Sequence, residues 1–147
     1  IVIVDVSNTT LPETVRTVDL PGARDIHLHQ KRDGSVIGLA VTSNGLVVLS
    51  SEGAHPEELA LRGTYQTQFA ERVYVDEEYA LVNEGVLGLN VLDLSNPDRP
   101  RRVSGSDLTY ASGATRFDSY AFAVDGSDLQ ILEILVPPWL EASTSRR

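Results

Sequence analysis

Cysteine and methionine are absent from the 147-residue sequence, and tryptophan occurs once. The lack of cysteine excludes disulfide bonds, thiolate metal sites and cysteine nucleophiles, and it leaves the redox compartment open. No apolar run approaches the ~18 residues of a membrane-spanning helix, so we predict no membrane span. The opening residues, IVIVDVSN, have no basic leader and no small-residue cleavage site, so no signal peptide is visible.

Positive charge is also scarce, because 12 Lys and Arg residues stand against 21 Asp and Glu residues and leave a net charge of −9. An acidic surface repels nucleic-acid phosphates and anionic lipid headgroups, so we predict neither nucleic acid nor a membrane surface as a partner. Hydrophobic residues at 41% and charged residues at 22% are ordinary for a soluble globular protein. The length fits one domain with a sizeable core.

What the sequence does contain is an internal repeat. An alternating apolar run led by Gly-Leu or Asp-Leu recurs as GLVVLSS, GLNVLDLS and DLQILEI, and the chain opens with the related IVIVDVS. The repeats start near Ile1, Leu46, Leu89 and Leu129, which are 45, 43 and 40 residues apart. A nearly constant period of this length is typical of repeat architectures.

Two further strand-like runs lie in each interval between successive repeats. They have β-branched and aromatic residues in period-two alternation and end at Gly, Pro, Asn and Asp, which are the signals of short strands and hairpins. The clearest runs are 26–28, 35–41, 73–75, 79–82, 115–117 and 120–124. No segment keeps a 3.6-residue periodicity, and four strands per unit of ~40–45 residues is the spacing of a β-propeller blade.

Counting these strands predicts an all-β fold that is a partial β-propeller. The chain would start on the third strand of one blade, run through two whole blades and end after the third strand of another, which gives thirteen strands. We therefore predict about three blades of four antiparallel strands and an incomplete ring in this chain, because closed rings have four to eight blades. Residues 1–135 are assigned to the partial propeller and residues 136–147 to a C-terminal tail or linker.

The alternation also predicts which side chains are buried. Ile3, Val48, Val91 and Ile131 lie at matching positions of the third strands, and we predict that they pack between adjacent blades. The Pro-Pro-Trp run at 137–139 cannot continue a strand, since proline donates no ladder hydrogen bond. We expect Trp139 to leave the sheet and to dock on an apolar surface.

The repeats resemble those of the LVIVD-repeat family of bacterial and archaeal surface β-propellers. IVIVDVSN and LNVLDLSNP are similar to the family text LxIVDxSNP, and Asp19–Gly22 (DLPG) is similar to the DxPG stretch that leads into the next blade. The resemblance covers about Ile1 to Leu135, although the middle repeat has Leu49-Ser50 where Val-Asp is expected. It implies a propeller for display or adhesion outside the cytoplasm, so the expected location is extracellular, cell-surface or periplasmic.

The strongest candidate for metal chemistry is the run RDIHLHQ, in which Asp25, His27 and His29 share one face of a predicted strand. Two imidazoles so spaced can reach one metal ion, and the carboxylate could complete three ligands. The alternative is structural, because polar side chains on the inner strands of a propeller often form hydrogen bonds between blades. The corresponding residues of the other repeats, Tyr74 and Arg116, favour this structural alternative. We predict no cofactor.

Two functions remain open on these observations. One is a non-catalytic binding or display module that engages a protein or a carbohydrate through its loops, and the other is an enzyme with a metal or acid–base site on the top face. The predicted top-face loops are 19–22, 66–69, 109–113 and the turns at Ser43, Asn83 and Asp125. They are rich in hydroxyl and amide groups, which suit hydrogen-bonded recognition better than proton transfer, so binding is the preferred interpretation.

Three short motifs have simpler explanations. The sequon Asn8-Thr9-Thr10 lies in a predicted surface turn, and it has meaning only where glycosylation occurs. The basic run RPRR at 99–102 is interpreted as a solvated turn, and DGSD at 125–128 as a hairpin turn without a calcium-loop pattern.

An incomplete ring predicts partners. Unpaired strand edges and uncovered blade faces are features that folded proteins avoid, so we expect the remaining blades to cover them. These blades could come from the same parent chain, from another chain or from a second copy. A chain without methionine that starts at Ile1 is expected to be a piece of a longer propeller.

Overall fold

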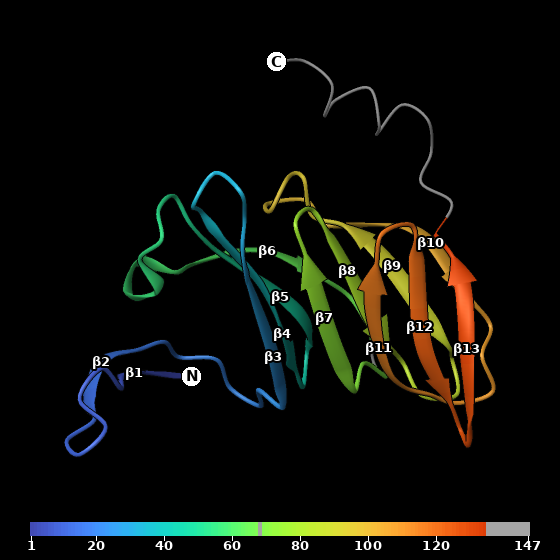
Figure 1. Cartoon of the computed structure of the whole chain (residues 1–147), viewed down its shortest axis with the longest axis horizontal. Helices are drawn as coiled ribbons and strands as arrows, with labels where there is room; N and C mark the ends of the chain where they lie inside the picture. The colour runs from blue at the N-terminus through green and yellow to red at the C-terminus, as the bar shows by residue number, and fades with distance from the viewer. Residues whose placement is uncertain (68, 135–147) are drawn as a thin grey trace.

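Four antiparallel β-sheets follow one another along the chain and stand side by side in space (Figure 1). The computed structural model describes residues 1–67 and 69–134. Within these residues there are thirteen strands, one 3₁₀ turn, η1 (Pro56–Glu58), and no α-helix. The strands are β1 (Val2–Asp5), β2 (Glu13–Thr17), β3 (Asp25–Gln30), β4 (Val36–Thr42), β5 (Gly45–Ser51), β6 (Ala60–Tyr65), β7 (Arg72–Asp76), β8 (Tyr79–Asn83), β9 (Leu89–Asp93), β10 (Arg101–Ser106), β11 (Ala111–Phe117), β12 (Tyr120–Asp125) and β13 (Asp128–Glu133).

Within each sheet, every strand pairs with the next one along the chain. The sheets are β1-β2, β3-β4-β5-β6, β7-β8-β9-β10 and β11-β12-β13, and all their pairs are antiparallel. Sheets of two, four, four and three strands confirm the predicted blade phase, in which the described chain enters on a third strand and ends on one. The fold is all-β and propeller-like, and the ring is open. Among the described residues, no helix is long and apolar enough to cross a membrane.

The repeated Asp-x-Ser text forms the same turn in two places. After β1, Oδ1 of Asp5 accepts a hydrogen bond from the amide of Ser7 at 2.8 Å. After β9, 88 residues later, Oδ1 of Asp93 accepts one from the amide of Ser95 at 2.9 Å. The aspartate therefore satisfies a backbone amide that has just left the sheet, which is a common use of this side chain in turns.

The asparagine that follows makes a second turn of the same kind in both repeats. Oδ1 of Asn8 accepts from the amide of Thr10 at 3.2 Å, and Oδ1 of Asn96 accepts from the amide of Asp98 at 3.1 Å. The middle repeat lacks this text, and there the hydroxyl of Ser51 donates to a backbone carbonyl two residues on, at 2.6 Å. The Asp-x-Ser-Asn text is thus a signal that ends the third strand and turns the chain toward the fourth.

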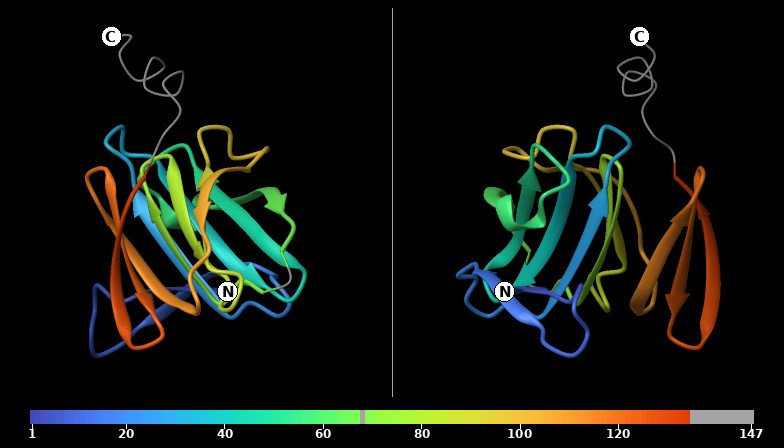
Figure 2. Two further views of the ribbon diagram at one scale, coloured as in Figure 1. Left: turned by 90° about the vertical axis from the view of Figure 1, so that its right-hand side faces the viewer. Right: turned by 60° about the vertical axis from the view of Figure 1, so that its left-hand side comes forward.

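The first strands of successive sheets lie next to one another on one side of the molecule. Strand β3 contacts β7, and β7 contacts β11, so these three strands face the axis about which the sheets are arranged (Figures 1 and 2). The third and fourth strands of each pair share a register shift in all three sheets that have both. Such bulges increase the local twist of a sheet and help to fan the outer strands apart.

Apolar side chains fill the space between neighbouring sheets. Leu39 and Val48 of the second sheet join Val75 and Leu92 of the third in one buried cluster. A second cluster, which includes Val91, connects the third sheet with the fourth. Burying each such side chain stabilises the fold by about 1.5–3 kcal/mol, so contact between sheets is a main source of stability.

The burial predictions for the third strands are only partly correct. Val48 and Val91 are buried as predicted, at 0% and 4% exposure. Ile3 is half-buried, and the prediction for Ile131 is wrong because this side chain is 60% exposed. The reason is that β13 belongs to the last sheet, and within 1–67 and 69–134 there is no further sheet to cover its outer side. The predicted docking of Trp139 and the tail 136–147 lie outside the described residues.

Candidate functional site

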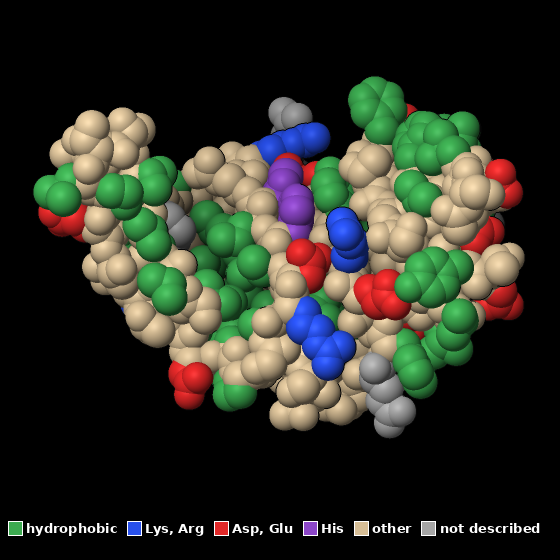
Figure 3. Space-filling view, turned by 90° about the horizontal axis from the view of Figure 1, so that it is seen from below, with side chains coloured by type: hydrophobic (Ala, Val, Ile, Leu, Met, Phe, Trp, Pro, Cys, Tyr) green, Lys and Arg blue, Asp and Glu red, His purple; other side chains and the backbone are tan. Residues whose placement is uncertain are grey.

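The loops predicted for the top face do lie together on one face of the sheets. This face is at the bottom of Figure 1 and toward the viewer in Figure 3. It is formed by the connections that precede β3, β7 and β11 and by the hairpin turns β4–β5, β8–β9 and β12–β13. Contacts tie these loops together: a Cβ atom on Gly22 would lie 2.5 Å from Oγ of Ser43, and the amide of Tyr110 donates to Oδ1 of Asp125 at 2.7 Å. We call it the top face.

A hollow of about 200 Å³ opens on the top face between the second, third and fourth sheets. Four separate loops supply its walls, which gives it the convergent character expected of a binding site on a propeller. Figure 3 shows acidic side chains next to hydrophobic ones on the right half of this face. The residues that line the hollow are Arg24, Phe69, Ala70, Glu71, Glu84, Gly85, Val86 and Tyr110.

Glu84 is the most buried charged side chain of the hollow, at 6% exposure. It follows β8 directly and opens the hairpin turn, in which its amide donates to the carbonyl of Gly88 at 2.9 Å. The amide of Leu87 donates in turn to the carbonyl of Glu84 at 3.0 Å. This turn fixes the backbone, and Oε1 of the carboxyl group is left buried without a hydrogen-bond partner among the described residues.

Glu71 carries the second carboxylate of the hollow and is held by a tyrosine from the next sheet. The hydroxyl of Tyr110 lies 3.1 Å and 3.2 Å from the two carboxylate oxygens of Glu71, to which it donates. This hydrogen bond and the nearby negative charge raise the pKa of Tyr110, so the phenol stays protonated at neutral pH. The interaction joins the connection before β7 to the connection before β11.

Beside the exposed Arg24 and Glu71, the rim of the hollow and the adjoining turn carry large apolar and aromatic side chains. Phe69 is 52% exposed, Val86 68%, Leu87 51% and Tyr110 40%. An exposed cluster of large apolar side chains on a rigid face is typical of a surface that binds a partner. Such a rim favours association with an apolar surface or with the apolar stem of a side chain.

The loops of this site are predicted from the sequence, whereas its two carboxylates are not. Loops 66–69 and 109–113 and the turn at Asn83 were predicted to face the same way, whereas Glu71 and Glu84 were not singled out. The two glutamates are 13 residues apart with β7 and β8 between them. The sequence signal that could have found them is that Glu71 lies just before β7 and Glu84 just after β8. The start of one strand and the end of its antiparallel partner lie at the same edge of a sheet.

Asp25 and His27 of the predicted metal site lie on β3 and bind the backbone of β7. Oδ2 of Asp25 accepts a hydrogen bond from the amide of Val73 at 2.9 Å, and Nδ1 of His27 accepts one from the amide of Val75 at 3.0 Å. The His27 ring also packs on the Tyr74 ring with centroids 4.7 Å apart. Both side chains therefore join neighbouring blades, as the structural alternative requires.

His29 faces a group of acidic side chains at the start of the β7–β8 turn. Its Nε2 lies 3.6 Å from Asp76 Oδ1 and 3.7 Å from Glu77 Oε1. On the other side, Nη1 of Arg116 lies 3.5 Å from Oδ2 of Asp76. The carboxylate of Asp76 is thus shared by cationic or titratable groups from β3 and β11, and it connects all three inner strands.

The metal hypothesis stays a prediction. No group of three or more His, Asp and Glu side chains with the geometry for a metal ion is found in residues 1–67 and 69–134. Asp25 and His27 each direct one acceptor atom at a β7 amide, which occupies that atom. The geometry supports the structural role of these residues and gives no support to a metal role.

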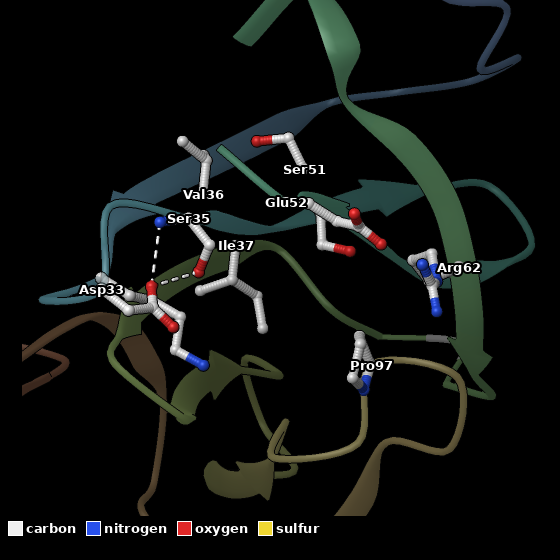
Figure 4. A pocket seen from close by; sticks show the side chains of 10 residues that line it. Asp33, Ser35, Val36, Ile37, Ser51, Glu52, Arg62 and Pro97 are labelled. Carbon is white, nitrogen blue, oxygen red and sulfur yellow. Dashed lines mark hydrogen bonds between the residues drawn. The ribbon is translucent and has the colours of Figure 1, made fainter. Parts of the chain in front are cut away.

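A second hollow, of about 320 Å³, lies at the opposite ends of β4, β5 and β6 (Figure 4). Three of the charged side chains that line it, Lys31, Asp33 and Arg62, already have partners within the protein. Asp33 accepts from the amide and hydroxyl of Ser35 at 2.9 Å and 2.6 Å, and Lys31 lies 3.7 Å from Glu78. Arg62 donates two hydrogen bonds, of 2.8 Å and 2.9 Å, to an aspartate carboxylate in the β9–β10 loop of the next sheet. This hollow is therefore explained by contacts between blades.

The basic run at 99–102 also has structural partners. Arg101 donates to Oδ2 of Asp93 at 3.0 Å and 2.8 Å, and Arg102 donates to Oδ1 of Asn90. Burial raises the pKa of Asp93, but the hydrogen bonds from Ser95 and Arg101 outweigh it and hold this pKa below its usual range. These arginines therefore fasten the fourth strand to the third.

Comparison with known proteins adds a family match. The sequence profile of the LVIVD repeat matches residues 1–19 and 69–105. The first segment contains β1 and β2, and the second contains β7 to β9 and most of β10. Both segments carry the Asp-x-Ser-Asn turn, and the departing middle repeat lies between them. No curated protein matches the chain.

Proposed function

Because two segments of the chain match the LVIVD repeat, we propose that it is a non-catalytic binding and display module that engages a protein ligand through its top face. The observation that carries this proposal is the convergence of loops from neighbouring sheets around one hollow with an exposed apolar rim. Rigid sheets position these loops, and binding residues are often carried on loops held in this way. A protein ligand is preferred to a carbohydrate because Phe69, Val86 and Leu87 offer apolar contact area.

We place the module outside the cytoplasm, at the cell surface, in the periplasm or in the surrounding medium. The support for this location is the surface function of the family that the repeats resemble. The sequon at Asn8 is exposed and compatible with such a location, although it would matter only in a glycosylating system.

The alternative is an enzyme with a metal or acid–base site on the same face. Elemental analysis of the purified protein separates the two, because a stoichiometric metal that is lost in His27→Ala would favour the enzyme. The loops themselves argue for binding, since the one hydrogen-bonded pair among the residues of the hollow, Tyr110 and Glu71, holds two loops together.

The open ring adds a second kind of partner to this proposal. The remaining blades, from the same parent chain, another chain or a second copy, would cover the apolar faces at both ends of the described sheets. Val2, Val4 and Val15 are 56%, 43% and 51% exposed at one end. Leu129 and Ile131 are 65% and 60% exposed at the other, so contact with further blades would remove apolar surface from water.

Site-specific photo-cross-linking in the cells that produce the protein tests the proposed function. A photoreactive residue at Val86 on the top face is expected to give a discrete protein adduct. The same residue at Arg32, which is 93% exposed on the opposite face, is expected to give none. Equal adducts at both positions, no adduct at either, or recovery of the protein solely from the cytoplasm would contradict the proposal.

A further inference from the structure

We propose that the top-face hollow binds a positively charged group with an apolar stem, an alkylammonium or guanidinium such as the side chain of lysine or arginine. This inference rests on the proposed binding function and adds the chemical class of the ligand. It is carried by one buried carboxylate oxygen of Glu84 that has no hydrogen-bond partner among the described residues, by a second carboxylate that lines the same hollow, and by the large apolar side chains of the rim.

The first observation is the buried acceptor on Glu84. Its side chain is more than nine-tenths buried and lines the hollow, yet Oε1 receives no hydrogen bond from any described residue. A desolvated carboxylate oxygen without a donor is unfavourable, so a ligand that brings an N–H donor and a positive charge would be stabilised there. The neighbouring Asn83 has a buried Oδ1 that also lacks a partner, which makes this turn rich in acceptors.

The second observation is that Glu71 is positioned to share the ligand. The Tyr110 hydroxyl holds its carboxylate, and this hydrogen bond leaves acceptor capacity for further donors on both oxygens. Gly85 permits the arrangement, because a Cβ atom there would lie 3.0 Å from Oε1 of Glu71 and 3.5 Å from the Tyr110 ring. The φ angle of Gly85 is +54°, which side-chain-bearing residues rarely adopt.

The rim selects the kind of cation. The exposed side chains of Phe69 and Val86 and the ring of Tyr110 can contact the methylene groups of a long basic side chain. Aromatic faces also attract ammonium and guanidinium groups. A bare metal ion would gain nothing from these apolar walls, and the described residues contain no group of three His, Asp and Glu ligands.

Arg24 is the one basic residue that lines the hollow, and it provides a test of the charge argument. It is exposed, and no ion pair between Arg24 and either glutamate is present among the described residues. As a like charge at the rim, it should weaken binding of a cationic ligand. Removing this charge in Arg24→Gln is therefore expected to strengthen binding of the cationic ligand.

Saturation-transfer NMR on the full chain tests the inference with small probes of matched shape. The probes are N-acetyl-lysine methylamide, N-acetyl-arginine methylamide, the neutral isostere N-acetyl-norleucine methylamide, 1,5-diaminopentane and calcium chloride as a competitor. We expect saturable binding of the lysine or arginine probe and about tenfold weaker binding in Glu84→Gln and Glu71→Gln. Glu58→Gln, which removes the same charge from exposed η1, is the matched control and should bind as the unaltered chain does.

The outcomes are distinct. Tighter binding of the amino-acid probes than of the diamine indicates a side chain of a protein partner, and the reverse order indicates a free amine; both support a cation site. Equal binding of the norleucine probe, no loss in either glutamine variant, or displacement of the probe by calcium at stoichiometric concentration overturns it. If the Val86 adduct forms in cells but neither the lysine nor the arginine probe shows saturable binding, the proposed function stands while this inference falls.

Discussion

At the scale of single residues, the polar side chains of β3 act as hydrogen-bond acceptors for the backbone of β7. His27 does this through Nδ1, which must be unprotonated to accept from Val75. Burial lowers the pKa of His27, and the neighbouring His29 lowers it further, although Asp25 and Asp76 act in the opposite direction. The folded protein therefore favours neutral His27 more than the unfolded chain does.

This pKa shift predicts a pH dependence of stability. The unfolded chain binds a proton on His27 near pH 6.5, whereas the folded protein binds it at lower pH. The contribution of His27 is therefore fully present above pH 6.5 and is lost as the pH falls through the lowered pKa. We expect acidification from pH 7.5 to 5.5 to reduce the free energy of unfolding more in the unaltered chain than in His27→Gln.

Urea unfolding at the two pH values measures this difference. His55→Gln serves as the control, because His55 is 65% exposed and its neighbour Glu57 is exposed as well. That variant should show the same acid sensitivity as the unaltered chain. If His27→Gln also keeps the full acid sensitivity, the hydrogen bond to Val75 is not a source of it.

At the scale of elements, equivalent third strands differ in what covers them. Strand β9 lies between two neighbouring sheets in the core, whereas β13 has a neighbouring sheet on one side only. The same alternation of apolar residues therefore gives a buried Val91 and an exposed Ile131. The sequence pattern marks a face that can be buried, and the neighbouring sheet decides whether it is.

Alanine substitutions in these two strands should lower the free energy of unfolding by different amounts. Val91→Ala removes two methyl groups from a packed site and should lower the free energy of unfolding by about 1–3 kcal/mol. Ile131→Ala removes more atoms, but from an exposed site. It should change the free energy of unfolding of the monomeric chain by less than about 0.5 kcal/mol. Chemical denaturation of both variants checks the register, since a small loss at Val91 would mean that β9 faces solvent at this position.

At the scale of the whole molecule, the open arrangement of sheets leaves apolar surface at both ends. The β1–β2 pair exposes valines, and the β11–β13 sheet exposes Phe117 at 76% together with Leu129 and Ile131. Exposed patches of this kind favour association, because contact removes apolar area from water. The charge of −9 opposes unspecific aggregation, so contact through complementary blade faces is favoured.

We expect the isolated chain to self-associate through these faces at micromolar concentration. Adding charge to the last sheet with Leu129→Lys and Ile131→Lys should shift the chain toward monomer in sedimentation velocity runs. Leu61→Lys is the control, because Leu61 is also exposed, at 49%, but lies on the outer strand β6. A monomeric unaltered chain, or an equal effect of the control, would contradict the role of the end faces.

The number, order and blade phase of the strands follow from the amino-acid sequence alone. This information is local: period-two alternation marks a strand, and the Asp-x-Ser-Asn text marks where a third strand ends, because its side chains bind amides two residues on. The sequence also predicts which loops form the top face, because successive turns of an up-and-down sheet lie alternately at the two ends of its strands.

Which of these residues contact one another depends on the tertiary structure. Asp25 and Val73 are 48 residues apart, and Glu71 and Tyr110 are 39 apart, so each contact depends on the angle and register between neighbouring sheets. No local pattern encodes that relation, because it arises from the packing of buried side chains between the sheets. For the same reason, the exposure of Ile131 and the buried Oε1 of Glu84, which has no partner among the described residues, follow only from the folded molecule.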